Sequence, residues 1–216
     1  MDCNFAAQLP SHLSSYYITM YTLIFATNNK NKVAEIQSLV GSEYNIIPLS
    51  EAGIHIDIPE PHDSLQENAF EKANTIYNIT NQNCFSEDTG LEIEALNGAP
   101  GVKSARYAGD DRDFQSNIDK VLFNLNGIEN RTAQFRTVIC LLWLNKNNVL
   151  DTFYFEGICK GHIAQAMQGE KGFGYDPIFI PAGSEKSFAE MSMEEKNKFS
   201  HRQKAVTKLF EFLSHQ

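Results

Sequence analysis

The spacing of apolar side chains changes along the chain, and each change predicts a new strand or helix. A short apolar run, Tyr21–Ala26, predicts a strand, and the polar residues 27–32 after it predict a turn. Apolar residues then recur at helical spacing from Val33 to Val40, which predicts a helix. The next apolar run, Tyr44–Pro48, predicts a second strand. Strand, turn, helix and strand in this order are typical of α/β folds.

The same two periods continue through the middle of the chain. Apolar residues at helical spacing predict a helix over 65–77, whose opposite face carries Glu67, Asn68, Glu71 and Lys72. The runs Cys84–Ser86 and Leu91–Ala95 predict two short strands with a polar segment between them. A third helical pattern begins at Phe114 and ends before Gly127.

Two long β-rich runs dominate the second half of the chain. Arg131–Leu144 and Val149–Ile163 are joined by the polar residues Asn145–Asn148, which predicts a long hairpin. We expect this hairpin to form a lobe of its own beside the α/β part, with a cleft between the two. Ser200 is placed to cap a last helix, whose apolar stripe ends at Leu213.

Length and composition favour a single folded domain. The chain has 216 residues, of which 42% are hydrophobic and 21% charged, and this is enough to bury a core without disulfides or a structural metal. Residues 1–19 show no periodicity and lack the basic start and apolar core of a signal peptide. We therefore predict a disordered tail at 1–19 and one domain over 20–216.

Charge and cysteine content narrow the class of function. The chain has 18 Lys and Arg against 27 Asp and Glu, a formal net charge of −9, which argues against partners such as nucleic acid or an anionic membrane surface. No apolar run approaches the ~18 residues that a membrane-spanning helix needs. The four cysteines form no C-x-x-C pair, so we expect reduced, packing cysteines in a cytoplasmic protein.

The first of four motifs that can carry chemistry fills the predicted turn before a helix. It consists of Thr27, Asn28, Asn29, Lys30, Asn31 and Lys32. A helix amino end presents free N–H groups and a positive dipole, and with Asn, Thr and Lys side chains it can hold phosphates. An ordinary Asn-rich helix cap is the alternative interpretation, because caps use the same residues.

The second motif is an acidic pair within the sequence SEDTG, residues 86–90. Glu87 and Asp88 follow an apolar run, and adjacent carboxylates repel each other unless a cation lies between them. Oxygen ligands suit Mg²⁺, and a carboxylate can also position or deprotonate a water. Glu60 is a candidate third carboxylate, and a solvated acidic turn is the alternative.

The third and fourth motifs are suited to the rest of a nucleotide. In GFGYDP, residues 172–177, Phe173 offers a flat face for a base and Asp176 an acceptor for a ring N–H or a ribose hydroxyl. In the last motif, His201 and Arg202 follow Ser200 at a helix amino end, where cations oppose the dipole. An acceptor-rich ligand would remove that conflict. A Gly-rich turn and a solvated basic turn are the alternatives.

In this order and combination the motifs resemble the inosine triphosphate pyrophosphatase family. The matching stretches are ATNNKNK at 26–32, SEDTGLEIEALNGAPGVKSARYAG at 86–109, GFGYDPIF at 172–179 and EEKNKFSHRQKA at 194–205. The resemblance covers about Tyr21 to Leu213. It implies an α/β fold with an elongated mixed β-sheet, surrounding helices and two lobes that enclose an active-site cleft. It also implies Mg²⁺-dependent hydrolysis of ITP, dITP and XTP to the monophosphate and pyrophosphate, by a homodimer.

The resemblance also implies a role for each motif residue. Asp88 would bind the metal and accept a proton, and Glu60 would help to hold the metal. The implied substrate contacts are Thr27, Asn28, Asn29, Lys30, Asn31, Lys32, Lys72, Thr89, Arg106, Phe173, Gly174, Tyr175, Asp176, Lys196, His201 and Arg202. Three positions depart from the family: Asn28 stands where many members have Gly, Glu87 where Asp is frequent, and Pro59 where some have a second Glu.

Two other functions remain open from the sequence alone. A related house-cleaning pyrophosphatase would act on modified pyrimidine or methylated nucleotides, although the motifs at 173–176 and 200–202 favour purines. A nucleotide-binding regulator without turnover would not need the acid pair that this chain carries. A panel of substrates separates the first alternative, and release of pyrophosphate separates the second.

Overall fold

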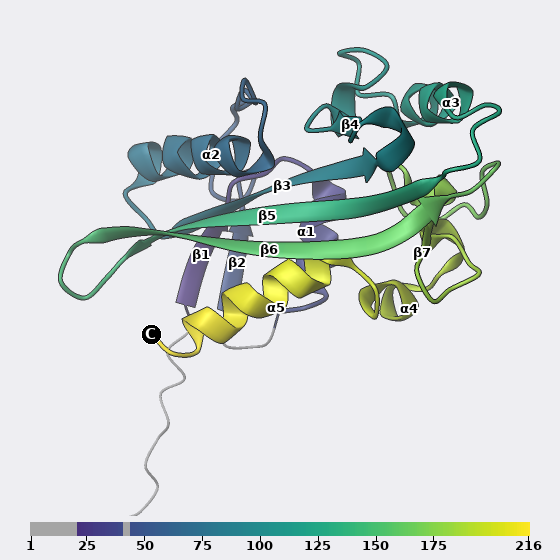
Figure 1. The fold of residues 1–216 in the computed structure, drawn as a ribbon. Helices are drawn as coiled ribbons and strands as arrows, with labels where there is room; N and C mark the ends of the chain where they lie inside the picture. Colours follow the sequence, from purple (N-terminus) through teal and green to yellow (C-terminus); the bar gives the residue numbers. More distant parts are fainter. Residues whose placement is uncertain (1–20, 41–43) are drawn as a thin grey trace, which may run out of the picture.

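One mixed sheet organises the molecule. The computed structural model describes residues 21–40 and 44–216, so the predicted tail at 1–19 lies outside the described residues. In the described part, seven strands form one sheet in the order β2-β1-β3-β5-β6-β7, with β4 beside β3. Figure 1 shows α2 on one face of the sheet and α5 on the other. The strands are β1 Tyr21–Phe25, β2 Tyr44–Pro48, β3 Cys84–Ile93, β4 Pro100–Gly101, β5 Thr132–Leu144, β6 Leu150–Ile163 and β7 Phe179–Pro181. The α-helices are α1 Lys30–Gln37, α2 Leu65–Thr80, α3 Phe114–Asn124, α4 Met193–Asn197 and α5 His201–Leu213.

The strand, helix and strand that the sequence predicted over residues 21–48 are present in that order as β1, α1 and β2. β1 and β2 pair in parallel, with α1 as the crossover between them. Leu23 and Phe25 of β1 are fully buried and pack with Ile36 of α1 and Leu209 of α5. These apolar contacts fix the end of β1 against the start of α1, which is where the predicted phosphate motif lies.

The acidic motif is part of a strand, which corrects the prediction of two short strands with a turn between them. β3 runs without interruption, and each of its residues has a partner in β5, from Cys84 opposite Leu142 to Ile93 opposite Ala133. The hydrogen bonds to β5 keep the backbone extended through the acidic pair. Consecutive side chains of a strand point to opposite faces, so Glu87 and Asp88 face different sides of the sheet.

The long hairpin is present, but it does not form a separate lobe. β5 and β6 pair along their whole length, and β5 also pairs with β3, so the hairpin forms the middle of the common sheet. One apolar cluster packs around α3 and β7 at one end of the sheet, and two others pack around β1, α2 and α5 at the other. The two lobes are therefore the two ends of one sheet, as Figure 1 shows.

One edge of β3 lacks a strand partner at its centre. β1 pairs with β3 only at Cys84 and Phe85, and β4 pairs with it only at Leu91 and Glu92. Within the described residues, no strand covers β3 between these two contacts on that edge. The acidic pair lies in this gap, and Asp88 is the member of the pair that faces the interval between the lobes.

The sequence predicted no membrane-spanning helix and predicted reduced cysteines. Among the residues that the structure describes, no helix is both long and apolar enough to cross a membrane. Cys84, Cys140 and Cys159 are buried and form no disulfide, as expected for packing cysteines. Cys3 lies outside the described residues.

Candidate active site

The gap beside β3 is the floor of a cavity of about 440 Å³, a volume typical of small-molecule sites. Both ends of the sheet and the helices around them contribute to its walls. Every residue that the sequence predicted for the site lines this cavity, with two exceptions. Lys30 is exposed at the start of α1, and Arg106 does not line the cavity itself but donates a hydrogen bond to Glu60, which does.

The amino end of α1 forms one wall, and its own side chains shape it. Asn29 caps the helix by accepting hydrogen bonds from the backbone N–H groups of Asn31 and Lys32, at 3.0 and 3.2 Å. Thr27 accepts a hydrogen bond from the N–H of Asn29, and Asn28 donates one to the carbonyl of Ile56. The turn is thus held rigidly against the loop after β2, with the positive end of the helix dipole directed at the cavity.

On one face of β3, Lys72 bridges two carboxylates. Its Nζ lies 2.7 Å from Glu60 Oε1 and 2.7 Å from Asp88 Oδ1, and the Nη1 of Arg106 lies 2.9 Å from Glu60 Oε2. This corrects the prediction that Asn68 and Lys72 occupy the polar face of their helix. Both are buried, because α2 presents them to the sheet together with its apolar residues.

The surroundings of Glu60 and Asp88 shift the pKa values of their carboxyl groups in opposite directions. Burial alone would raise the pKa of Glu60, but Lys72, Lys32 and Arg106 outweigh it and lower the pKa to about 2. Asp88 is more deeply buried, and this burial, with the nearby charge of Glu60, raises its pKa despite Lys72 and Lys32. Asp88 is therefore the more basic of the two, which suits a group that accepts a proton.

On the other face of β3, Glu87 is held by cations of the protein. Arg202 donates from Nε and Nη2 to the two carboxylate oxygens of Glu87, both at 2.8 Å, and Lys32 Nζ lies 3.1 Å from Glu87 Oε1. Burial opposes ionisation of Glu87, but Arg202 and Lys32 outweigh it and hold the pKa well below its ordinary value. Glu87 is thus a structural anion that does not line the cavity itself but binds Lys32 and Arg202, which do, and so links β3 to α1 and to the last helix.

A second buried carboxylate, Glu35 of α1, completes this network. It accepts a hydrogen bond from Arg202 Nη1 and another, 2.7 Å long, from Lys196 Nζ. Lys196 also lies 2.7 Å from Asp176 Oδ2. Arg202, in the first turn of α5, therefore meets carboxylates of the protein itself. The sequence predicted that an acceptor-rich ligand would offset its conflict with the helix dipole, and in the structure Glu35 and Glu87 already do so.

The aromatic end of the cavity lies above these cations. Lys196 Nζ and Arg202 Cζ lie 5.4 and 5.7 Å from the centroid of the Phe173 ring, within the range of cation–π contact. His201 stacks on Phe135 at 4.7 Å and is almost fully buried, and its Nδ1 has no hydrogen-bond partner among the residues that the structure describes. Burial lowers the pKa of His201 well below 6.5, so a neutral imidazole faces this end of the cavity.

The loop that carries Phe173 depends on a glycine. Gly172 has a φ of +76°, and a Cβ there would collide with the carboxylate of Asp176. The same carboxylate accepts a hydrogen bond from the N–H of Phe173, at 2.9 Å. Asp176 therefore fixes the ring of Phe173 through the loop and also binds Lys196, so its acceptor capacity is largely used within the protein.

Sequence reasoning missed several residues of the site. Glu35 was absent from the motifs, although its spacing of three from Lys32 places both on one side of α1 and gives the only hint. Thr137 was also missed: it is fully buried, and its hydroxyl lies 2.6 Å from that of Thr89. Asp57, Arg112 and Phe114 also line the cavity, from loops and a helix start, and the sequence did not point to them as site residues.

The donor set suits a hard divalent cation. Mg²⁺ in nucleotide sites is typically held by one or two carboxylates together with substrate phosphates and water. Glu60 and Asp88 supply two carboxylates that already share one cationic partner, Lys72. No group of three or more His, Cys, Asp or Glu able to hold a metal occurs among the described residues, so such an ion would depend on the substrate for further ligands.

Comparison with known proteins agrees with this geometry. The model of the Ham1 family matches residues 23–212. The chain belongs to the Ham1 family. The dITP/XTP pyrophosphatase of Flavobacterium psychrophilum is 50% identical over 190 residues, which cover 88% of this chain and 97% of that protein. The dITP/XTP pyrophosphatase of Bacillus subtilis is 42% identical, over 91% of this chain and 98% of that protein.

Solved structures of the family have the same fold. A HAM1 protein from Coxiella burnetii superposes with a TM-score of 0.81 at 37% identity, covering 91% of this chain and all of that one. The Staphylococcus aureus Ham1 protein gives a TM-score of 0.79 at 36% identity, over 90% of this chain and 98% of that one. Family membership confirms the resemblance drawn from the four motifs, and the structures confirm the expected mixed sheet with surrounding helices.

Proposed function

We propose that the protein hydrolyses non-standard purine nucleoside triphosphates (ITP, dITP and XTP) to the monophosphate and pyrophosphate. The observation that carries this proposal is the order of groups along one cavity. The amino end of α1 lies at one wall, the carboxylates Glu60 and Asp88 lie beside it, and Phe173 with its cations lies beyond. Relatives that share 40–50% of the sequence are named dITP/XTP pyrophosphatase, which supports the same substrates.

The reaction follows from the positions of the chain's own groups. The triphosphate binds at the amino end of α1, where Asn28, Asn31 and Lys32 line the cavity. Asp88 accepts a proton from a water as that water attacks the α-phosphorus. A new P–O bond forms to the water oxygen, the bond from the α-phosphorus to the bridging oxygen breaks, and pyrophosphate leaves. Lys72 holds Asp88 in place and offsets negative charge in the transition state.

Mg²⁺ is the cofactor that we propose for this site, held by Glu60 and Asp88. When bound, it supplies positive charge to the triphosphate and lowers the pKa of a bound water. Lys72 would then share the two carboxylates with the ion. We expect chelation of divalent cations to abolish hydrolysis and re-addition of Mg²⁺ to restore it.

The aromatic end accounts for the choice of base. Phe173 offers a face for stacking, and Lys196, His201 and Arg202 provide donors near the edge of the base. Hypoxanthine and xanthine carry an acceptor, the 6-oxo group, where adenine carries an amino donor. A donor left unpaired in a buried site lowers catalytic efficiency, and such mismatches discriminate by up to about 10⁴-fold.

The test is a substrate panel with product analysis. The purified protein is incubated with ITP, XTP, dITP and ATP, with and without Mg²⁺, and the phosphorus products are identified by ³¹P NMR. We expect pyrophosphate and monophosphate from the first three and little turnover of ATP. Release of orthophosphate would contradict the proposed bond cleavage. A preference for modified pyrimidines would favour a related house-cleaning pyrophosphatase, and binding without turnover would favour a nucleotide-binding regulator.

We also propose that the protein is a homodimer and acts in the cytoplasm. The family resemblance supports the first statement, and the buried, unpaired cysteines support the second. Light scattering of the purified chain measures its mass, and one chain has a mass of 24.3 kDa. A mass of one chain at micromolar concentration would contradict the dimer, and recovery outside the cytoplasmic fraction would contradict the location.

A further inference from the structure

An arginine at the rim of the cavity has only a weak partner. Arg112 lies just before α3 and Asp57 lies in the loop before α2, and both line the cavity. The Nη2 of Arg112 is 3.5 Å from Asp57 Oδ1, and the side chains are 45% and 81% exposed. An exposed pair of this length contributes little to stability, so the structure does not need Arg112 at this place.

The other cations of the cavity are committed to buried carboxylates. Lys32 is paired with Glu87, Lys72 with Glu60 and Asp88, Lys196 with Glu35 and Asp176, and Arg202 with Glu35 and Glu87. If one of them turned away from its carboxylate to bind a ligand, the carboxylate would lose its counter-charge, which is strongly unfavourable. Each can therefore offer a ligand only the N–H groups that its carboxylates leave free. Among the described residues that line the cavity, Arg112 is the one cation whose partner lies mostly in water.

The position of Arg112 favours the phosphate end of the cavity. Its partner Asp57 follows Ile56, whose carbonyl accepts a hydrogen bond from the Asn28 side chain, 2.8 Å long. Arg112 thus pairs with the residue next to the one that anchors the turn before α1, and both Arg112 and this turn line the cavity. The backbone of Arg112 has a φ of +55°, which is disfavoured for a residue with a Cβ. Such conformations often occur at ligand sites.

From these contacts we infer that Arg112 exchanges Asp57 for the phosphate chain of the substrate when the nucleotide binds. The inference rests on the proposed function and adds a binding residue to it. A guanidinium can bind phosphate with two hydrogen bonds, so it holds the chain in one orientation as well as offsetting its charge. Without substrate, Asp57 pairs with Arg112. When the pair breaks, the carboxylate of Asp57 is solvated by water, so the free energy lost is small.

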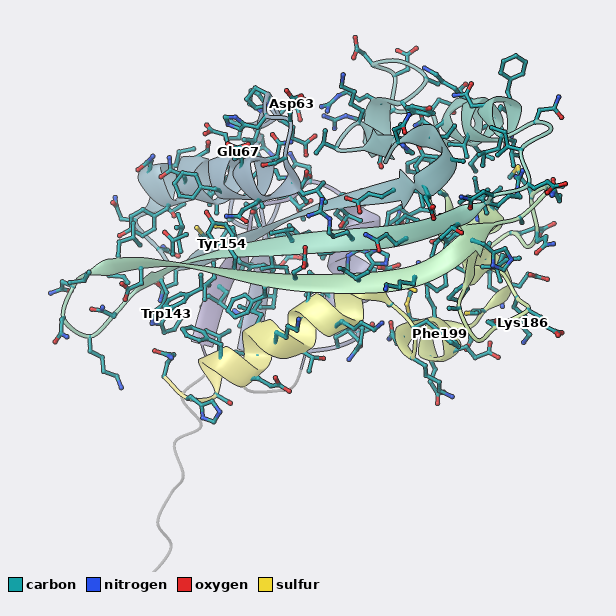
Figure 2. All side chains as sticks on the ribbon, in the orientation of Figure 1. Asp63, Glu67, Trp143, Tyr154, Lys186 and Phe199 are labelled. Atoms are coloured by element: carbon teal, nitrogen blue, oxygen red, sulfur yellow. The ribbon has the colours of Figure 1, made fainter. Side chains whose placement is uncertain are left out.

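Steady-state kinetics with ITP test the exchange. We expect Arg112→Gln to raise KM about tenfold or more, as for the loss of a charge-assisted hydrogen bond. Asp57→Asn should leave KM unchanged or lower it by up to about fivefold, because it frees Arg112 from its partner. Arg112→Lys should give an intermediate KM, because it keeps the charge without the two-pronged geometry. The matched control is Lys186→Gln, since Lys186 is half exposed, forms a similar surface pair with Glu195 and is not among the residues that line the cavity. Figure 2 shows Lys186 at the outer edge of the molecule.

Binding of inorganic tripolyphosphate, measured by calorimetry on the full chain, separates this inference from the proposed function. Arg112→Gln should weaken tripolyphosphate about tenfold even if ITP proves not to be the substrate. The inference is overturned if Arg112→Gln binds tripolyphosphate and ITP within about twofold of the unmodified chain. It is also overturned if Asp57→Asn raises KM as much as Arg112→Gln, because the pair itself would then shape the rim.

Discussion

At the scale of single residues, the site depends on which of its two carboxylates, Glu60 or Asp88, is the stronger base. Asp88 is buried and bonded to Lys72, and burial raises its pKa. We expect Asp88→Asn to lower kcat for ITP by at least about 10²-fold, the effect of losing a general base. Substrate binding should change much less, because the contacts of the triphosphate with α1 remain. Glu92→Gln is the control, since Glu92 lies on the same face of β3 but binds Arg136 outside the cavity. A kcat near that of the unmodified chain would remove Asp88 from the mechanism.

The ionised state of Glu35 couples the site to the stability of the fold. Burial opposes its ionisation, but Arg202 and Lys196 outweigh burial and lower the pKa of Glu35 below 4.5 in the folded protein. A lowered pKa stabilises the fold at pH above 4.5, and this contribution is lost as the pH falls through 4.5 toward the folded-state value. Glu35→Gln should therefore reduce the free energy of unfolding at pH 7 by on the order of 3 kcal/mol.

Denaturant unfolding at several pH values measures this contribution. The difference between the unmodified chain and Glu35→Gln should be largest at neutral pH and should shrink below pH 4.5. Glu211→Gln, an exposed change on α5, serves as the control and should show no such trend. A difference that stays constant from pH 7 to pH 3 would contradict the ionic role of Glu35.

At the scale of elements, the sequence predicted most helices and strands but not what polar residues do inside them. The strand period was hidden at Ser86–Gly90, because polar side chains on both faces read as a turn. An extended backbone at Ser86–Gly90 is favourable because this segment pairs with β5 and because buried cations of other elements bind its carboxylates. Lys72 was assigned to the wrong face of α2 for the same reason: its partners, Glu60 and Asp88, come from distant segments.

The packing of α5 on β6 requires a glycine at position 157. A Cβ at Gly157 of β6 would lie 2.6 Å from the backbone N of Ala205 and closer still to the carbonyl of His201. Gly157→Ala should therefore push α5 away from the sheet. We expect it to lower the free energy of unfolding by on the order of 3 kcal/mol, as for severe overpacking. It should also lower kcat/KM for ITP, since His201 and Arg202 open α5.

Gly53→Ala is the matched control for this change. A Cβ at Gly53 meets no atom of the described residues within 4 Å, and its φ of +70° opposes the substitution. It should cost about 1–2 kcal/mol and leave kcat/KM unchanged. Equal kinetics for the two variants, measured at a temperature where both are folded, would show that the contact between α5 and β6 does not position the site.

At the scale of the whole molecule, the four motifs converge because the sheet brings its two ends to one gap. The sequence predicted their convergence through the family resemblance, and the buried network behind them comes from residues with no motif, such as Glu35 and Thr137. The prediction of a separate hairpin lobe was wrong. The local pattern shows that the two β-rich runs pair with each other, but it does not show that β5 also pairs with β3. Contacts between distant segments are what a single sequence read in order does not reveal.

The extent of the functional domain can be tested by shortening the chain. Residues 1–19 carry no motif, and the family model begins at residue 23. A chain that begins at Met20 should keep the melting temperature and the kcat/KM for ITP of the full chain. A large loss of either quantity would show that the first 19 residues contribute to the folded body.

The pairing of the cavity's cations with carboxylates has a consequence for how fast a nucleotide finds the site. Charges that are matched within a few ångströms produce little field at a distance, and the chain as a whole carries a net charge of −9. A free triphosphate therefore approaches against a weak repulsion, without electrostatic steering. Moderate salt screens this repulsion, so the association rate should stay constant or rise with ionic strength, whereas a site lined with unpaired cations would capture its ligand more slowly as salt is added.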